Sequence, residues 1–113
     1  MSVPEGYVEV MSADEVEEEL IYPFAVDDED RVLTRVEGEI CALEGICTHE
    51  YAELAEGEVE DGTIWCPLHG SGFDVHTGAV TNLPATVPLK TYDVKVIDGA
   101  VYVAREPKSG PEE

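Results

Sequence analysis

The chain has 113 residues, of which 43% are hydrophobic, and this predicts a single domain with a modest core. Its 26 acidic residues against 6 basic ones give a formal net charge of −20, which excludes nucleic acid and anionic lipid surfaces as partners. No apolar run approaches the roughly 18 residues that a membrane span requires. The first basic residue is Arg31, so we expect no positively charged leader and predict a cytoplasmic protein.

The outer parts of the chain show the alternation of apolar and polar residues that is typical of β-strands. Strands are expected at residues 6–11, 20–26, 31–36, 39–45, 90–96 and 100–104. Pro23 predicts an edge position for the second strand or a bulge in it, because proline cannot donate a ladder hydrogen bond. Residues 12–20 fit either a short helix, with Ser12 as its cap and Glu15 in the capping box, or a solvated acidic loop. The dipeptide 37–38 predicts a tight hairpin turn.

A loop-rich insert interrupts this β-framework. Glycine, proline and short apolar runs dominate from about residue 45 to residue 89, whereas regular β-texture covers residues 6–44 and 90–104. The polar residues 105–113 predict a frayed, flexible tail. We therefore expect an all-β protein in which residues 1–113 form one domain, with the insert held inside the framework.

Most of the cysteines and histidines lie in the insert as two close pairs. Cys47 precedes His49 by two positions, and Cys66 precedes His69 by three. Three cysteines are an odd number, which argues against a disulfide scaffold and favours metal ligands in a reducing compartment. The four side chains suit tetrahedral zinc, although zinc fingers usually group like with like. One cysteine and one histidine on each loop also suit a [2Fe–2S] cluster with two thiolates on one iron and two imidazoles on the other.

The two pairs resemble the signature of Rieske-type [2Fe–2S] proteins, C-x-H followed by C-x-x-H. The resemblance continues through residues 70–74, 77–78 and 83–85, and it covers about residues 36–104. It implies one [2Fe–2S] cluster, with Cys47 and Cys66 on the inner iron and His49 and His69 on the outer iron. It also implies the Rieske fold: stacked antiparallel sheets with an inserted loop-rich cluster-binding subdomain, whose third loop around residues 83–85 covers the cluster.

The surroundings of the expected cluster differ from those of respiratory Rieske proteins. Those relatives carry one more cysteine in each loop, joined as a disulfide, at positions that match Ala52 and Leu68, and a tyrosine that matches Phe73. Ser71 still matches a serine that can donate a hydrogen bond to a cluster sulfide. Fewer donors to sulfur, together with acidic surroundings, predict a low reduction potential.

This combination is similar to the ferredoxin component of bacterial aromatic-ring-hydroxylating dioxygenase systems. The similarity implies an electron carrier rather than an enzyme. It would take electrons from a ferredoxin reductase, a flavoprotein, and pass them to a terminal Rieske non-haem iron oxygenase in aromatic compound degradation. We expect a monomer with no nucleic-acid or membrane partner, and a chain of 113 residues leaves no room for a second, mononuclear iron domain. The alternatives are a small redox subunit of a nitrite reductase-type system and, from a third class, a zinc-stabilised interaction module.

The resemblance places partner docking near His49 and His69, at the tip formed by residues 47–51 and 66–72. Two kinds of surface are available there. The acidic pair Glu50 and Glu53 could steer a basic partner, or an apolar patch around Leu68 and Pro84 could dock it while the acidic residues only keep the protein soluble.

One cysteine and one histidine lie outside the two pairs. Cys41 has apolar neighbours in an expected strand, and we interpret it as a small buried apolar residue. His76 follows a short apolar run and is predicted to be an exposed strand or turn residue.

Overall fold

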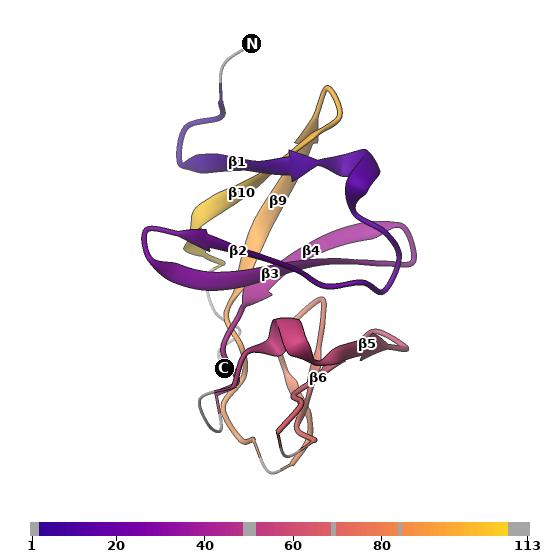
Figure 1. Cartoon of the computed structure of the whole chain (residues 1–113). Coiled ribbons are helices and arrows are strands. Elements are labelled where there is room, and N and C mark those ends of the chain that lie inside the picture. Colours follow the sequence, from indigo (N-terminus) through magenta and orange to yellow (C-terminus); the bar gives the residue numbers. More distant parts are fainter. Residues whose placement is uncertain (1–2, 49–51, 69, 84, 109–113) are drawn as a thin grey trace.

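The computed structural model of the chain describes residues 3–48, 52–68, 70–83 and 85–108, and within them it is nearly all β (Figure 1). Two antiparallel sheets contain the strands. The framework sheet has the order β1-β10-β9-β4-β3-β2, and its members are β1 (Tyr7–Ser12), β2 (Tyr22–Val26), β3 (Glu29–Val36), β4 (Glu39–Glu44), β9 (Thr91–Ile97) and β10 (Ala100–Pro107). The insert sheet has the order β5-β6-β7-β8, and its members are β5 (Glu58–Glu60), β6 (Thr63–Trp65), β7 (Gly72–Asp74) and β8 (Val80–Asn82). All four strands of the second sheet lie between β4 and β9 in the chain, as the predicted insert requires.

The framework sheet curls until its two edge strands face each other. Residues 8–10 of β1 and residues 24–26 of β2 line the same groove, although the two strands are at opposite ends of the strand order. The interior of the curl contains buried side chains from four of the strands and from the β1–β2 connection. They are Val16, Leu33, Ala42, Tyr92, Val101 and Val103.

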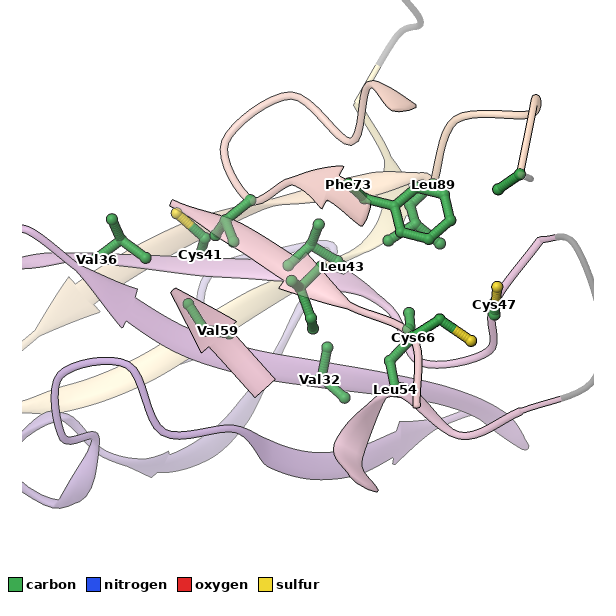
Figure 2. Packing of buried hydrophobic residues seen from close by; sticks show 13 residues of the cluster. Val32, Val36, Cys41, Leu43, Cys47, Leu54, Val59, Cys66, Phe73 and Leu89 are labelled. Carbon is green, nitrogen blue, oxygen red and sulfur yellow. The ribbon is translucent and has the colours of Figure 1, made fainter. Parts of the chain in front are cut away.

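Strands β3 and β4 have apolar side chains on both faces because both faces are covered. Leu33 and Ala42 point into the curled sheet, whereas their neighbours Val32 and Leu43 point toward the insert, as the two-residue period of a strand requires. The second cluster of buried residues includes side chains of both sheets, and Figure 2 shows them packed together. This shared core fixes the insert against the framework.

Tight turns define the hairpins. Glu37 and Gly38 have φ angles of 52° and 84°, and Asp98 and Gly99 have φ angles of 51° and 82°. Two successive residues with positive φ are typical of the type I′ turn, whose twist matches that of the flanking strands. The predicted hairpin at residues 37–38 is confirmed. The predicted edge position of Pro23 is also confirmed, since β2 pairs only with β3.

The expected capped helix at residues 12–20 is not formed. A single 3₁₀ turn, η1 (Ala13–Glu15), follows β1, and the Ser12 side chain makes no capping hydrogen bond. The Arg35 guanidinium donates to the Ala13 and Val16 carbonyl groups at 2.8 and 2.7 Å, and these contacts hold the segment after η1 against β3 in a non-helical path. The chain after Val16 is exposed, as in the alternative of a solvated acidic loop.

The prediction of a tail that is frayed from Arg105 onward is wrong for residues 105–107, which belong to β10. The buried Arg31 guanidinium, at 3.7 Å from the centroid of the Tyr92 ring, donates to the carbonyl groups of Ala104 and Arg105 at 2.7 and 2.6 Å. The Lys108 amide also donates to the Thr91 carbonyl at 2.8 Å. These contacts, which local sequence cannot reveal, extend the strand.

Helices are few in the described part of the chain, and none of them has the length and apolar character that crossing a membrane demands.

Candidate metal centre

Three loops of the insert meet at the end of the molecule that lies away from β1 (Figure 1). The first loop joins β4 to the short turn η2 (Leu54–Glu56) and contains Cys47. The second joins β6 to β7 and contains Cys66, and the third joins β8 to β9. Cys47 and Cys66 are far apart in the sequence, but these loops place both of them at one end of the fold.

Backbone hydrogen bonds fold the first loop on itself. The Gly45 amide donates to the Asp30 carbonyl at 2.8 Å, and the Leu54 amide donates back to the Gly45 carbonyl at 2.8 Å. Between these contacts, the Cys47 amide donates to the Ala52 carbonyl at 3.0 Å. The position of Cys47 is thus fixed relative to β3 rather than left to an open loop.

The second loop is a tight turn at the end of a hairpin. The Cys66 amide donates to the Ser71 carbonyl at 2.8 Å, and the Gly70 amide donates to the Cys66 carbonyl at 3.3 Å. Gly70 has a φ angle of 77°, a conformation that glycine adopts without the steric cost of a side chain. This geometry explains the glycine that follows the C-x-x-H segment.

The third loop connects the other two. The Thr48 hydroxyl donates to the Val87 carbonyl at 2.5 Å, and the Ala85 amide donates to the Ser71 hydroxyl oxygen at 3.0 Å. Ser71 and Ala85 are both fully buried. Thr48 and Ala85 were not singled out by the sequence, since neither residue type signals a ligand, and only their place beside the motifs hinted at a role.

Cys47 and Cys66 are each only 4% exposed, and both belong to the core cluster that the two sheets share. Figure 2 shows their sulfur atoms at the same end of this cluster, close to Leu54, whereas Cys41 lies at the other end. Two sulfur donors from separate loops in a dry, apolar setting fit a thiolate-bound iron–sulfur cluster, because soft sulfur ligands and restricted solvent access are what such clusters need. The donor set present in the described residues is therefore compatible with the expected group.

Ser71 and Phe73, which the resemblance compares with residues beside the cluster in respiratory Rieske proteins, are both buried. A hydroxyl group has one donor and two acceptor sites, so Ser71 can accept from Ala85 and still donate its own proton to a nearby acceptor. Phe73 is fully buried and offers no donor. A donation from Ser71 to a cluster sulfide stays a prediction.

His49 and His69 lie outside the described residues, as do Glu50 and Pro84. Within the described ranges, no group of three or more histidine, cysteine, aspartate or glutamate side chains is close enough to hold a metal ion. The part of the docking surface that is described shows Glu53 and Leu68 lining one groove. One residue of the expected acidic surface and one of the expected apolar patch therefore share this groove.

Cys41 and His76 have the surroundings predicted for them, but they also touch. Cys41 is buried, His76 is exposed in the turn after β7, and the Cys41 sulfur lies 3.4 Å from His76 Nδ1. Glu39 Oε1 is 3.5 Å from the same nitrogen. Burial, and secondarily the charge of Glu39, raises the pKa of the Cys41 thiol to about 11, so this thiol is protonated at neutral pH.

Comparisons with known proteins agree with this geometry. The family description "Rieske [2Fe-2S] domain" matches residues 6–93. Ferredoxin CarAc of Metapseudomonas resinovorans is 46% identical over 66% of this chain and 69% of its own length. The ferredoxin component of the naphthalene 1,2-dioxygenase/salicylate 5-hydroxylase systems of a Ralstonia species is 34% identical over 90% of this chain and 98% of its own length. A ferredoxin solved in the complex of reduced oxygenase and oxidized ferredoxin in carbazole 1,9a-dioxygenase superposes with a TM-score of 0.88 and 36% identity over 94% of this chain and 99% of that chain.

The fold and the matched family define a protein that carries one [2Fe–2S] cluster and transfers electrons without catalysing a reaction itself. The chain belongs to the Rieske [2Fe–2S] family, and the relatives that share its length are ferredoxins. The zinc-stabilised module is therefore wrong, because the matched family holds a [2Fe–2S] cluster.

Proposed function

We propose that Cys47 and Cys66 hold the inner iron of the cluster and that His49 and His69 hold the outer iron. Two buried sulfur atoms from separate loops support the first half of this assignment. The histidines are assigned from the motif alone. When bound, the cluster accepts and releases one electron at a time.

The residues around this end keep it dry and rigid. Leu54 and Phe73 are fully buried in the same core cluster as the cysteines and help to keep it dry. The bonds from Thr48 to Val87 and from Ala85 to Ser71 hold the three loops together. A rigid setting suits electron transfer, since little reorganisation is needed when the charge changes.

In this proposal the protein works in an aromatic-ring-hydroxylating dioxygenase system. It takes one electron from a flavin-dependent ferredoxin reductase and passes it to the terminal oxygenase, docking near His49 and His69. The observation that carries the proposal is the similarity along nearly the whole chain to ferredoxins of such systems, one of them solved together with its oxygenase. The cytoplasmic location and the monomeric state stay predictions.

Single-turnover electron transfer tests the proposal. The purified protein is reduced with dithionite, freed of the excess, and mixed without oxygen with the terminal oxygenase of either the carbazole or the naphthalene system. At least one of them should reoxidise it, seen as the return of its visible absorption, and Cys66→Ala should give no signal. If neither oxygenase takes the electron, and a nitrite reductase-type partner does, the dioxygenase assignment is wrong.

The reductase half of the proposal needs its own measurement. NADH and a catalytic amount of the flavin reductase of the same system should bleach the visible absorption of the protein. The bleaching should stop when the reductase is left out. Reduction by NADH alone at the same rate would contradict the assigned donor.

A further inference from the structure

Two grooves lie on either side of the turn η2, which Figure 1 shows as the short coiled ribbon of the insert. The first, called here the loop groove, is lined by Ala52, Glu53, Glu56, Pro67 and Leu68. The second, called here the framework groove, is lined by Glu19, Leu20, Ile21, Tyr22, Ala55, Gly57, Glu58 and Val59. Ala55 and Glu56 are consecutive residues of η2 and belong to different grooves, so only this turn separates them.

Each groove exposes one large apolar side chain. Leu20 in the framework groove is 50% exposed, and Leu68 in the loop groove is 51% exposed. Each leucine has further apolar neighbours in its groove, such as Val59 beside Leu20 and Pro67 beside Leu68. Apolar side chains gathered in hollows with polar rims are typical of surfaces that bind another protein.

The charges at the rims are all of one sign. Each groove has two exposed glutamates, Glu53 and Glu56 in the first and Glu19 and Glu58 in the second. None of these four carboxylates has an ion-pair partner among the residues that the structure describes. The sequence contains no lysine or arginine between Arg35 and Lys90, so the insert offers no cation of its own. A complementary surface must supply positive charge and apolar side chains together.

We propose that the terminal oxygenase lays a basic segment with at least two apolar side chains across η2, so that it occupies the loop groove and the framework groove at once. This inference rests on the proposed function. Pro67 and Leu68 directly follow Cys66, so an occupant of the loop groove lies beside the proposed cluster loop. The framework groove adds a second point of contact on a different element, which fixes the orientation of the partner.

Substitutions in each groove, with matched controls elsewhere, test the proposal. Glu53→Gln with Glu56→Gln changes the loop groove, and Leu20→Ser changes the framework groove. Glu5→Gln with Glu106→Gln removes the same charge from exposed framework positions, and Val96→Ser alters a side chain that is 52% exposed on β9. Leu68 is left unchanged because it adjoins the proposed ligand His69.

The measurement is the stopped-flow oxidation of the reduced protein by the oxygenase that accepts its electron, over a range of oxygenase concentrations. Each groove variant should raise the half-saturating concentration about fivefold or more, a loss that only the residues contributing most to an interface produce. The controls should stay within about twofold, and all visible spectra and limiting rates should match those of the wild type. Added salt should reduce the increase in half-saturating concentration caused by the two Glu→Gln substitutions, because salt screens charges. The increase caused by Leu20→Ser should stay the same.

The possible failures are distinct. Groove variants that bind the oxygenase as tightly as the wild type does would rule out the docking site. Equal losses of affinity in the control variants would mean that overall charge attraction, and not the grooves, accounts for binding. If the groove variants lose affinity for the flavin reductase and not for the oxygenase, then the reductase occupies the grooves and the proposed partner is wrong. If the wild-type protein passes no electron to any oxygenase, the proposed function itself fails, irrespective of the variants.

Discussion

The hydroxyl oxygen of Ser71 accepts a hydrogen bond from the Ala85 amide at 3.0 Å, and both residues are fully buried. Ser71 belongs to the second loop, and Ala85 belongs to the third loop. The contact therefore joins two of the three loops around the candidate metal centre. It also leaves the Ser71 proton available to a second acceptor.

Ser71→Ala should destabilise the protein by about 1–3 kcal/mol, because the buried Ala85 amide loses its acceptor. Chemical denaturation of both proteins measures the difference. Thr81→Ala removes an exposed hydroxyl from the same insert and should cost less than about 0.5 kcal/mol. If Ser71 also donates to a cluster sulfide, its replacement should lower the reduction potential as well, whereas an unchanged potential would limit Ser71 to holding the loops.

The purified protein should contain iron and inorganic sulfide in the amounts of one [2Fe–2S] cluster per chain. His69→Cys should give a strained or missing cluster, because a thiolate differs from an imidazole in reach and charge. Cys41→Ala should retain the full cluster, since its side chain lies at the other end of the core from Cys47 and Cys66. Elemental analysis and visible spectra measure both outcomes; zinc without labile sulfide would contradict the assigned cofactor.

The reduction potential should lie near the low end of the Rieske range, at roughly −150 mV rather than +300 mV. Phe73 is buried in the core cluster that contains the cysteines and offers no donor to sulfur. Phe73→Tyr should raise the potential if the new hydroxyl reaches a sulfur atom, because a donor stabilises the more negative, reduced state. Spectroelectrochemical titration of the two proteins measures the shift, and a wild-type value well above zero would show that the comparison with respiratory proteins is mistaken.

The Cys41 thiol should make the stability of the protein fall at high pH. Its pKa is raised from an ordinary 9.0 to about 11 in the folded state, first by burial and then by the charge of Glu39. The unfolded chain therefore releases this proton at lower pH than the folded one, so the stabilisation is complete below pH 9 and is lost as the pH rises toward 11. Urea denaturation at pH 8 and pH 10.5 should show a smaller decline for Cys41→Ala than for the wild type; equal declines would mean that other groups account for it.

Gly57→Ala should destabilise the insert by about 3 kcal/mol or more, the upper part of the range for overpacking. A Cβ atom at this position would lie 1.9 Å from the Trp65 carbonyl oxygen. This oxygen is a backbone atom, so it cannot move aside as the end of a flexible side chain could. Gly99→Ala is the matched control, because its Cβ would meet nothing within 4 Å and only its φ of 82° opposes the change. The control should cost about 1–2 kcal/mol. Thermal denaturation followed by circular dichroism compares the two, and similar losses would show that the contact at Gly57 relaxes easily.

Local sequence patterns determined the β-strands and the hairpin turn at residues 37–38, because alternation and positive-φ dipeptides act between near neighbours in the chain. The spacing of Cys47–His49 and Cys66–His69 indicated metal ligands and left zinc and a [2Fe–2S] cluster open, and the resemblance of the two pairs to the Rieske signature implied the cluster. Both patterns can be interpreted without knowing what lies across the fold.

Contacts between distant residues decided the rest. Arg31 extends β10 past Arg105, and Arg35 donates to the carbonyl groups of Ala13 and Val16 and holds that segment against β3. The closure of the three loops through Ser71 and Ala85, and the grooves on both sides of η2, likewise depend on side chains that meet only after the insert packs on the framework. The sequence by itself determined the strand pattern and the two paired ligand motifs, because these depend on local spacing. Only the tertiary structure decided where the two grooves lie, because each groove is lined by separate segments of the chain that meet in the fold.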